Sequence, residues 1–287
     1  MKIEILKPLG FSDLGNRSSQ QDALFPSLQN FSSDDRVFIV CDGMGGHAKG
    51  EVASNAVVNS FSTHSSELSE ILSADMFEDI LEQVWCDLDS CYDEGLGESQ
   101  MGTTLAFLAF TPNGYLAAHI GDSRIYHIRP SKVSQIIYRS TDHSQVSSML
   151  ANGEITPIDS LLYEGKNILN KAMIPQIRYE PEIFEGTDVM AGDYFMLCSD
   201  GVIETLTDEM IRFIFAPYRT PEDICKLIHL HCQQLSVDNN TCVIVPVAGI
   251  DDDLLTTQLP ASPKGRDSVW QDDELLRESI SLLNKKC

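Results

Sequence analysis

Short apolar runs recur along the chain, and each is bounded by Gly, Asp or Asn. They are rich in β-branched and aromatic residues, which is typical of buried strands. We expect strands over 37–41, 104–110, 115–120, 123–128, 194–198 and 241–247. The turn residues Pro112-Asn113-Gly114 separate the second run from the third, so these two runs are predicted to form an antiparallel hairpin.

Amphipathic segments with helical spacing alternate with these runs. They predict helices over 51–61, 76–88, 144–150, 208–215 and 221–235. Thr207 and Thr220 stand at expected N-cap positions, and Pro221 stands at a first helical position. Because the strands come in hairpins rather than in strand–helix–strand units, we predict an α+β fold in which helices cover antiparallel sheets.

Composition excludes several classes of protein. The chain has 287 residues, of which 43% are hydrophobic, so it can bury a sizeable core. Its 20 basic and 43 acidic residues give a formal charge of −23, and no basic run offers a nucleic-acid surface. No apolar run reaches the roughly 20 residues that span a bilayer, and the first residues lack a signal peptide's apolar stretch. We therefore expect a cytoplasmic protein without a membrane span.

A change of composition after Val247 divides the chain. We expect one domain over 1–249 and a polar linker with an amphipathic C-terminal helix over 250–287. The apolar face of that helix would carry Val269, Leu276, Ile280 and Leu283. The sequence leaves open whether this face packs on its own domain or on a partner.

Aspartates stand where the predicted strands begin or end, and one more stands in a polar loop near the start. A carboxylate beside a buried strand is costly unless it is paired or bound to a metal. Convergence of several such groups therefore predicts a site for Mg²⁺ or Mn²⁺, which prefer oxygen ligands. The strand-end residues are Asp42, Asp122, Asp200 and Asp238, and the loop residue is Asp22.

The segment 42–51 is a glycine-rich turn between a predicted strand and a predicted helix. It lacks the Lys-Ser/Thr pair of a Walker A loop and the spacing of a dinucleotide-binding fingerprint. It places the imidazole of His47 shortly after Asp42. The turn thus adds a candidate proton donor to the candidate metal ligands.

Six short motifs follow one another along the chain: Gly15-x-Arg17-x-x-x-Gln21-Asp22-Ala23, Asp42-Gly43-Met44-Gly45-Gly46-His47, Met101-Gly102-Thr103-Thr104, Gly121-Asp122-Ser123-Arg124, Ser199-Asp200-Gly201 and Asp238-Asn239-x-Thr241. Taken together and in order, these motifs resemble those of the metal-dependent protein phosphatases of the protein phosphatase 2C (PPM) type, particularly the bacterial members. The resemblance covers roughly residues 8–247, and Thr141-Asp142-His143-Ser144 matches the segment that leads into that family's flap, expected here over about 145–181.

The resemblance implies two packed antiparallel β-sheets flanked by helical layers, an αββα sandwich. It also implies two Mn²⁺ or Mg²⁺ ions and a third, weaker one. Asp42 would bridge the two ions, and the Gly43 carbonyl would bind one of them. Asp22 would act on one ion largely through water. Asp200 and Asp238 would bind the other ion, and Asp122 the third.

The resemblance further implies hydrolysis of phosphoserine and phosphothreonine. Two cations that share a water lower its pKa, so that it can attack phosphorus without a protein nucleophile. Arg17 matches the phosphate-binding arginine, whose planar fork suits two phosphate oxygens. His47 would give a proton to the departing serine or threonine oxygen.

Some residues have a simpler, structural interpretation. Gln20 stands where the family commonly has Asn, which puts the local turn in question but leaves Asp22 in place. We expect Arg124 to form a structural ion pair and His143 to act as a cap or hydrogen-bonding residue. Thr103 and Thr104 are expected to support the start of a strand.

Several functions remain open at this point. Phosphorylated proteins are the expected partners, with a Ser/Thr kinase as the counterpart. The alternatives are a pseudophosphatase that binds partners without turnover, a partner-binding role for the C-terminal segment alone, and a small-molecule phosphohydrolase. Metal-dependent hydrolysis of p-nitrophenyl phosphate separates the enzymes from the binding modules.

Overall fold

Two six-stranded antiparallel sheets form the centre of the protein in this computed structural model. The structure describes residues 2–45, 49–64, 73–91, 101–156, 159–160, 163 and 168–251. The first sheet has the order β1 (Lys2–Ile5), β12 (Asn240–Asp251), β11 (Tyr194–Cys198), β8 (Arg124–Arg129) and β9 (Gln135–Arg139), and β2 (Leu9–Asp13) also pairs with β12. The second has the order β10 (Glu182–Gly186), β7 (Gly114–Ile120), β6 (Leu105–Thr111), β4 (Val37–Met44) and β3 (Asp22–Phe25), and β5 (Gly102–Thr103) pairs with β4.

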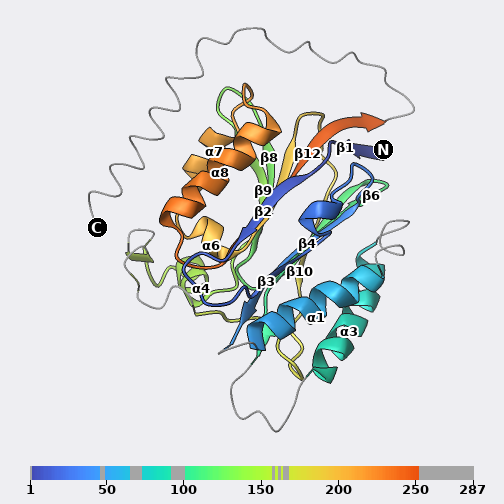
Figure 1. Cartoon of the computed structure of the whole chain (residues 1–287), viewed down its shortest axis with the longest axis vertical. Helices are drawn as coiled ribbons and strands as arrows, with labels where there is room; N and C mark the ends of the chain where they lie inside the picture. The colour runs from blue at the N-terminus through green and yellow to red at the C-terminus, as the bar shows by residue number, and fades with distance from the viewer. Residues whose placement is uncertain are drawn as a thin grey trace.

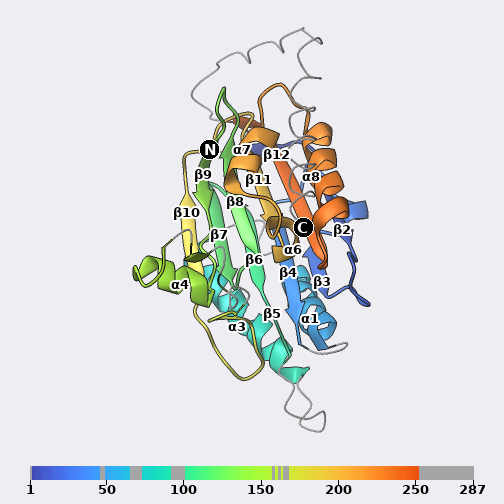
Figure 2. The same cartoon turned by 90° about the vertical axis from the view of Figure 1, so that its left-hand side faces the viewer.

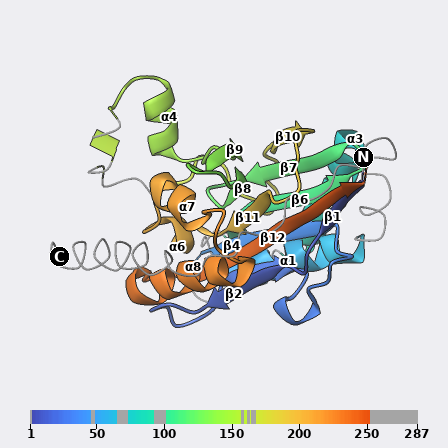
Figure 3. The same ribbon diagram turned by 90° about the horizontal axis from the view of Figure 1, so that it is seen from above.

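Helices cover the outer faces of both sheets. Figure 1 shows α1 and α3 on one side and α7 and α8 on the other. The helices are α1 (Lys49–Thr63), α3 (Ala74–Ser90), α4 (Gln145–Ala151), α6 (Asp200–Ile203), α7 (Asp208–Ile214) and α8 (Pro221–Leu235), with a short 3₁₀ turn η1 (Leu28–Asn30). Figures 2 and 3 show α4 standing away from the sheets. The predicted α+β sandwich is confirmed.

Three hydrophobic clusters correspond to the three spaces between these four layers. Strand β4 shows why the sequence reads as continuous apolar runs. Its Ile39 packs in the cluster that contains α1 and α3, whereas Phe38 and Val40 pack in the cluster between the sheets. A strand that is buried on both faces needs apolar residues at every position, not at every second one.

The hairpin predicted around Pro112-Asn113-Gly114 is confirmed, because β6 and β7 pair in antiparallel register. Both predicted caps are also confirmed. Thr207 accepts a hydrogen bond from the Met210 amide, and Thr220 forms a capping box with Asp223. The strands that were not predicted from the pattern are short or carry several polar residues; they are β1, β2, β3, β5, β9 and β10.

The structure differs from three expectations about where elements lie. Asp22 is not in a loop but is the first residue of β3. Strand β12 continues to Asp251, where it pairs with Lys2, and so it is longer than the strand expected over 241–247. In the expected flap over 145–181, Met173 is fully buried and pairs with Thr103, so this residue belongs to the core and not to a separate flap.

The expected C-terminal helix lies outside the described residues, which end at 251. The proposed division into a domain and a C-terminal segment therefore stays a prediction. None of the described helices is both long enough and apolar enough to span a lipid bilayer.

Candidate metal centre

Carboxylates from both sheets meet at one end of the sandwich. Asp22 and Asp42 are direct cross-strand partners on β3 and β4. Asp200 follows β11 and Asp238 precedes β12, both in the first sheet. Asp122 lies between β7 and β8, where the chain crosses from one sheet to the other.

All of these residues except Asp22 line a cavity of about 450 Å³. Its lining includes Arg17, Asp42, Gly43, Asp122, Asp200 and Asp238. The structure therefore brings together the predicted site residues that it describes, and Asp22 is buried beside this lining as the cross-strand partner of Asp42. His47 lies outside the described residues, which stop at Gly45 and resume at Lys49.

The cavity is electrostatically costly. Burial, followed by the neighbouring Asp22 and Asp200 charges, raises the pKa of Asp42 well above its usual range. Burial is also the main cause that raises the pKa of Asp22 and that of Asp122, each to about 7. Among the residues that the structure describes, the buried Oδ1 atoms of Asp22 and Asp200 have no hydrogen-bond partner. An all-oxygen donor set with unsatisfied, repelling carboxylates fits Mg²⁺ or Mn²⁺ well.

Hydrogen bonds from the first sheet hold Asp22. Its side chain is 6% exposed, and its Oδ2 accepts a hydrogen bond of 2.8 Å from the Ser199 hydroxyl. Ser199 Oγ in turn accepts the Thr241 amide at 3.0 Å. Ser199 thus links a carboxylate of one sheet to the backbone of the other. The sequence motif Ser199-Asp200-Gly201 contained this residue, but its role was not predicted.

Threonines and glycines position Asp42 and Gly43. The Asp42 amide donates to Thr104 Oγ1 at 2.9 Å, and Thr103 Oγ1 donates to the Asp42 carbonyl at 2.9 Å. This confirms the supporting role expected for the two threonines. A Cβ atom on Gly43 would lie 2.2 Å from the Gly50 carbonyl oxygen. Gly43 therefore allows α1 to approach β4, a reason for glycine that the sequence alone did not reveal.

A turn before β3 brings Arg17 to the cavity. Gly15 has φ +59°, and a Cβ atom there would lie 2.1 Å from the Asp238 carbonyl oxygen. The Arg17 side chain is 57% exposed, and its Nη2 lies 2.5 Å from Asp238 Oδ2. Asn239 fastens this segment, because its Nδ2 donates to the carbonyls of Leu14 and Ser19. Asn239 is a second supporting residue that the sequence contained in a motif without indicating its role.

Gln20 replaces the expected Asn without loss of the turn. Its Oε1 accepts the Asp22 amide at 3.1 Å, which is the bond to a residue two positions on that Asn commonly makes. Its Nε2 also donates to Ser12 Oγ and to the Asp13 carbonyl. The longer side chain therefore adds a contact with β2 and leaves Asp22 in position.

The turn that carries Asp122 is held by the segment after β9. Arg124 forms two hydrogen bonds of 2.6 Å with Asp142. The His143 amide donates to the Gly121 carbonyl at 2.9 Å, and the Gly121 amide donates to His143 Nδ1 at 3.1 Å. Both structural interpretations, an ion pair for Arg124 and a hydrogen-bonding role for His143, are confirmed.

Comparisons with known proteins agree with this geometry. The family model described as "Protein phosphatase 2C" matches residues 9–227. The serine/threonine protein phosphatase PstP of Mycobacterium tuberculosis is 29% identical over 259 residues, which are 86% of this chain and 46% of PstP. The protein phosphatase PhpP of Streptococcus pneumoniae is 32% identical over 188 residues, covering 62% of this chain and 72% of PhpP.

A solved structure extends the comparison. The catalytic domain of PstP in complex with two manganese ions is 26% identical, has a TM-score of 0.68, and aligns over 85% of this chain and 99% of that domain. This chain spans less than half the length of full PstP. The similarity to PstP therefore concerns one domain of a longer protein.

Proposed function

Because the chain belongs to the protein phosphatase 2C family, we propose that it is a metal-dependent phosphatase that hydrolyses phosphoserine and phosphothreonine in proteins. The observation that carries the proposal is the meeting of Asp22, Asp42, Asp200 and Asp238 beside Arg17 at one end of the two sheets. Arg17 supplies a cation that can bind phosphate, and the carboxylates supply the ligands for the ions.

The proposed ligand set follows the arrangement of the chain. Asp42 would be held by both ions, since it pairs with Asp22 across β3 and β4 and lines the cavity together with Asp200. The Gly43 carbonyl and Asp22 would hold one ion, Asp200 and Asp238 would hold the other, and Asp122 would hold a third. When bound, the ions supply a water acidic enough to attack phosphorus at neutral pH.

The other proposed tasks fall to Arg17 and His47. An ion pair with Asp238 keeps the Arg17 side chain at the cavity wall. Because more than half of this side chain is exposed, its guanidinium can reorient and bind two phosphate oxygens. His47 is proposed to donate a proton to the serine or threonine oxygen of the leaving group. A general acid matters most for such alkoxide leaving groups, because their conjugate acids are weak.

A second cavity, of about 390 Å³, adjoins the first and shares Asp122 and Asp200 with it. Its remaining wall includes Ser144, Val146, Ser147 and Leu150 at α4. We assign it to the residues that flank the phosphorylated one, since a small phosphometabolite would not need a second cavity. This feature favours a protein substrate, with a Ser/Thr kinase as the counterpart.

The test compares phosphothreonine peptides, p-nitrophenyl phosphate and small phosphometabolites in Mn²⁺, Mg²⁺ and EDTA. We expect metal-dependent hydrolysis of the peptides, abolished by EDTA and reduced by several orders of magnitude in Asp42→Asn. The matched control is Asp188→Asn, an exposed carboxylate that pairs with Arg129 away from the cavity. Peptide binding without turnover would instead indicate a pseudophosphatase, and preference for metabolites would indicate a small-molecule phosphohydrolase.

A further inference from the structure

A turn between the metal centre and α3 has a strained backbone. Among the residues that the structure describes, Gln176 is the one non-glycine residue with a positive φ, at +66°. It follows Pro175, and the Ile177 amide donates to the Ile174 carbonyl at 3.1 Å. Proline at the second position and a positive φ at the third define a type II turn, which normally has glycine or asparagine at the third. A glutamine there keeps this conformation only when its surroundings hold it.

Asp89, near the end of α3, holds this turn. Its Oδ1 accepts the Gln176 amide at 2.6 Å and Arg178 Nη1 at 3.1 Å, and its Oδ2 accepts Arg178 Nη2. The hydrogen bonds from Arg178 lower the pKa of Asp89, so the carboxylate stays charged at neutral pH. The Arg178 guanidinium also lies over the ring of Trp85, 5.1 Å from its centroid. We call Asp89, Arg178 and Trp85 the anchor.

The anchored turn belongs to a segment, residues 168–178, that we call the strap. Leu169 of the strap lines the metal cavity. Met173, which is fully buried, pairs with Thr103 in both directions, with amide-to-carbonyl distances of 2.7 and 2.9 Å. Thr103 Oγ1 in turn donates to the Asp42 carbonyl at 2.9 Å. A continuous set of contacts therefore joins the anchor to the residue that is proposed to bind both ions.

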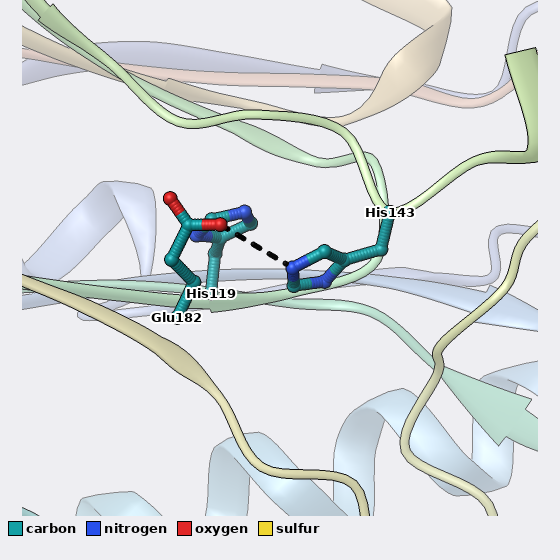
Figure 4. A group of neighbouring side chains, drawn as sticks. All are labelled: His119, His143 and Glu182. Atoms are coloured by element: carbon teal, nitrogen blue, oxygen red, sulfur yellow. Dashed lines mark ion pairs between the residues drawn. The ribbon is translucent and has the colours of Figure 1, made fainter. Parts of the chain in front are cut away.

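The other end of the strap is held from the core. The Asn170 amide donates to the His143 carbonyl at 2.8 Å. Figure 4 shows His143 beside His119 and Glu182. The His143 ring stacks on the ring of the buried His119, with centroids 4.5 Å apart, and its Nε2 lies 3.6 Å from Glu182 Oε2. This end is therefore fixed by buried groups, whereas the end at Gln176 depends on a partly exposed ion pair.

We propose that Asp89 is a positioning residue for the metal centre, because it holds the strained turn and thereby keeps the strap where Thr103 can fix the Asp42 carbonyl. Without the anchor, Gln176 relaxes toward a negative φ. Met173 lies only three residues before it, so the relaxing turn displaces Met173 and with it Thr103. The effect on metal binding rests on the proposed function, but the effect on the position of Thr103 does not.

The test compares Asp89→Ala with Asp79→Ala in the full chain. Asp79 is exposed on the same helix, about three turns earlier, so its variant is the matched control. In EDTA, amide hydrogen exchange at Gln176, Met173 and Thr103 should be faster in Asp89→Ala than in wild type and unchanged in Asp79→Ala. Calorimetry should show that Asp89→Ala binds Mn²⁺ about 2–30-fold more weakly, the range expected for a substitution along a contact network. Asp79→Ala should bind Mn²⁺ like wild type.

A second substitution tests the role of the strained turn. Glycine adopts a positive φ without strain, so Gln176→Gly should make the turn less dependent on the anchor. When Asp89→Ala is added to Gln176→Gly, it should accelerate exchange at Thr103 and weaken Mn²⁺ binding less than it does in wild type.

Two results would overturn the proposal. One is faster exchange at Gln176 in Asp89→Ala with unchanged exchange at Thr103, because the anchor would then not act on Asp42. The other is an equal effect of Asp89→Ala with and without Gln176→Gly, which a purely structural contact of Asp89 would give. If wild type binds no Mn²⁺, the proposed function fails, and exchange at Thr103 in EDTA still decides whether Asp89 positions this residue.

Discussion

Asp22 illustrates how individual residues in this protein are placed at an energetic cost. A carboxyl group in water has a pKa near 4, but burial raises the pKa of Asp22 to about 7. The folded, metal-free protein therefore holds protons between about pH 4 and pH 7 that the unfolded chain has released. Stability from such a group is present at low pH and is lost as the pH rises through the folded value.

The resulting prediction concerns the metal-free protein. In EDTA, the melting temperature should fall by several degrees from pH 5 to pH 8, because a loss of about 1 kcal/mol lowers it by about 2–4 °C in a protein of this size. Mn²⁺ should restore it at pH 8, and Asp22→Asn should reduce the dependence on pH. Scanning calorimetry can measure all of these values. A melting temperature that is the same at both pH values would contradict the assigned burial.

Arg17 and His47 should fail in different ways. Arg17→Ala should mainly raise KM for phosphopeptides, because the side chain binds phosphate. His47→Ala should mainly lower kcat on phosphoserine, by about 10²–10⁴-fold if it is the general acid. Its defect should shrink on p-nitrophenyl phosphate, since p-nitrophenol leaves without a proton. Equal defects on both substrates would assign His47 a structural role.

At the residue scale, the sequence indicated the candidate ligands but not their supports. Asp42 and Asp200 were recognisable because they end apolar runs and precede glycines. Ser199 and Asn239 could not be assigned roles in the same way. Their partners, Asp22 and the segment 14–21, are distant in sequence and become neighbours only when β2 and β12 pair.

At the scale of elements, the contact of β4 with α1 shapes the metal centre. Gly43 and Gly50 meet backbone to backbone, so neither position has room for a side chain. The Gly43 amide also donates to the Gln21 carbonyl, which joins β4 to the segment before β3. The position of a proposed ligand carbonyl thus depends on the packing of a helix.

We predict that Gly43→Ala and Gly50→Ala each destabilise the protein by about 1–3 kcal/mol, because backbone atoms must move apart. Both should also weaken Mn²⁺ binding, measured by calorimetry. Gly249→Ala is the control, since the nearest atom to its Cβ would be Glu4 Oε2 at 3.7 Å. Unchanged stability in the first two variants would show that α1 can shift without disturbing β4.

Elements could be predicted where burial dictates the pattern. Strands β4, β6, β7, β11 and β12 are buried on both faces, and their apolar runs were visible. Edge strands such as β9 and β10 have one neighbour and alternate less clearly, so their existence depends on tertiary pairing.

At the scale of the whole molecule, β12 closes the first sheet at its centre. It pairs with β1, β2 and β11, so the end of the described chain is tied to its beginning. A shortened chain must therefore keep Asp251, whose partner is Lys2.

We predict that a chain ending at Asp251 retains metal-dependent phosphatase activity. If the C-terminal segment packs on its own domain, the melting temperature should fall. If it binds a second copy, self-association should be lost, which analytical ultracentrifugation can measure; if it binds another protein, that binding should be lost while the melting temperature is unchanged. Loss of activity in a shortened protein that remains folded would place the C-terminal segment in the active site.

The supply of acidic groups by both sheets has a mechanical consequence. Asp22 and Asp42 lie on strands of one sheet, whereas Asp200 follows β11 and Asp238 precedes β12 of the other, so ions held between them would act as cross-links. Amide hydrogen exchange should reveal this, with slower exchange near Asp42 and Gly201 after Mn²⁺ is added. Amides beside the buried His127–Asp193 pair, outside the acidic cavity, should change little. With Mn²⁺ bound, the two sheets would separate first at the end away from the acidic cavity. Without metal, the repelling carboxylates would favour separation at the cavity end.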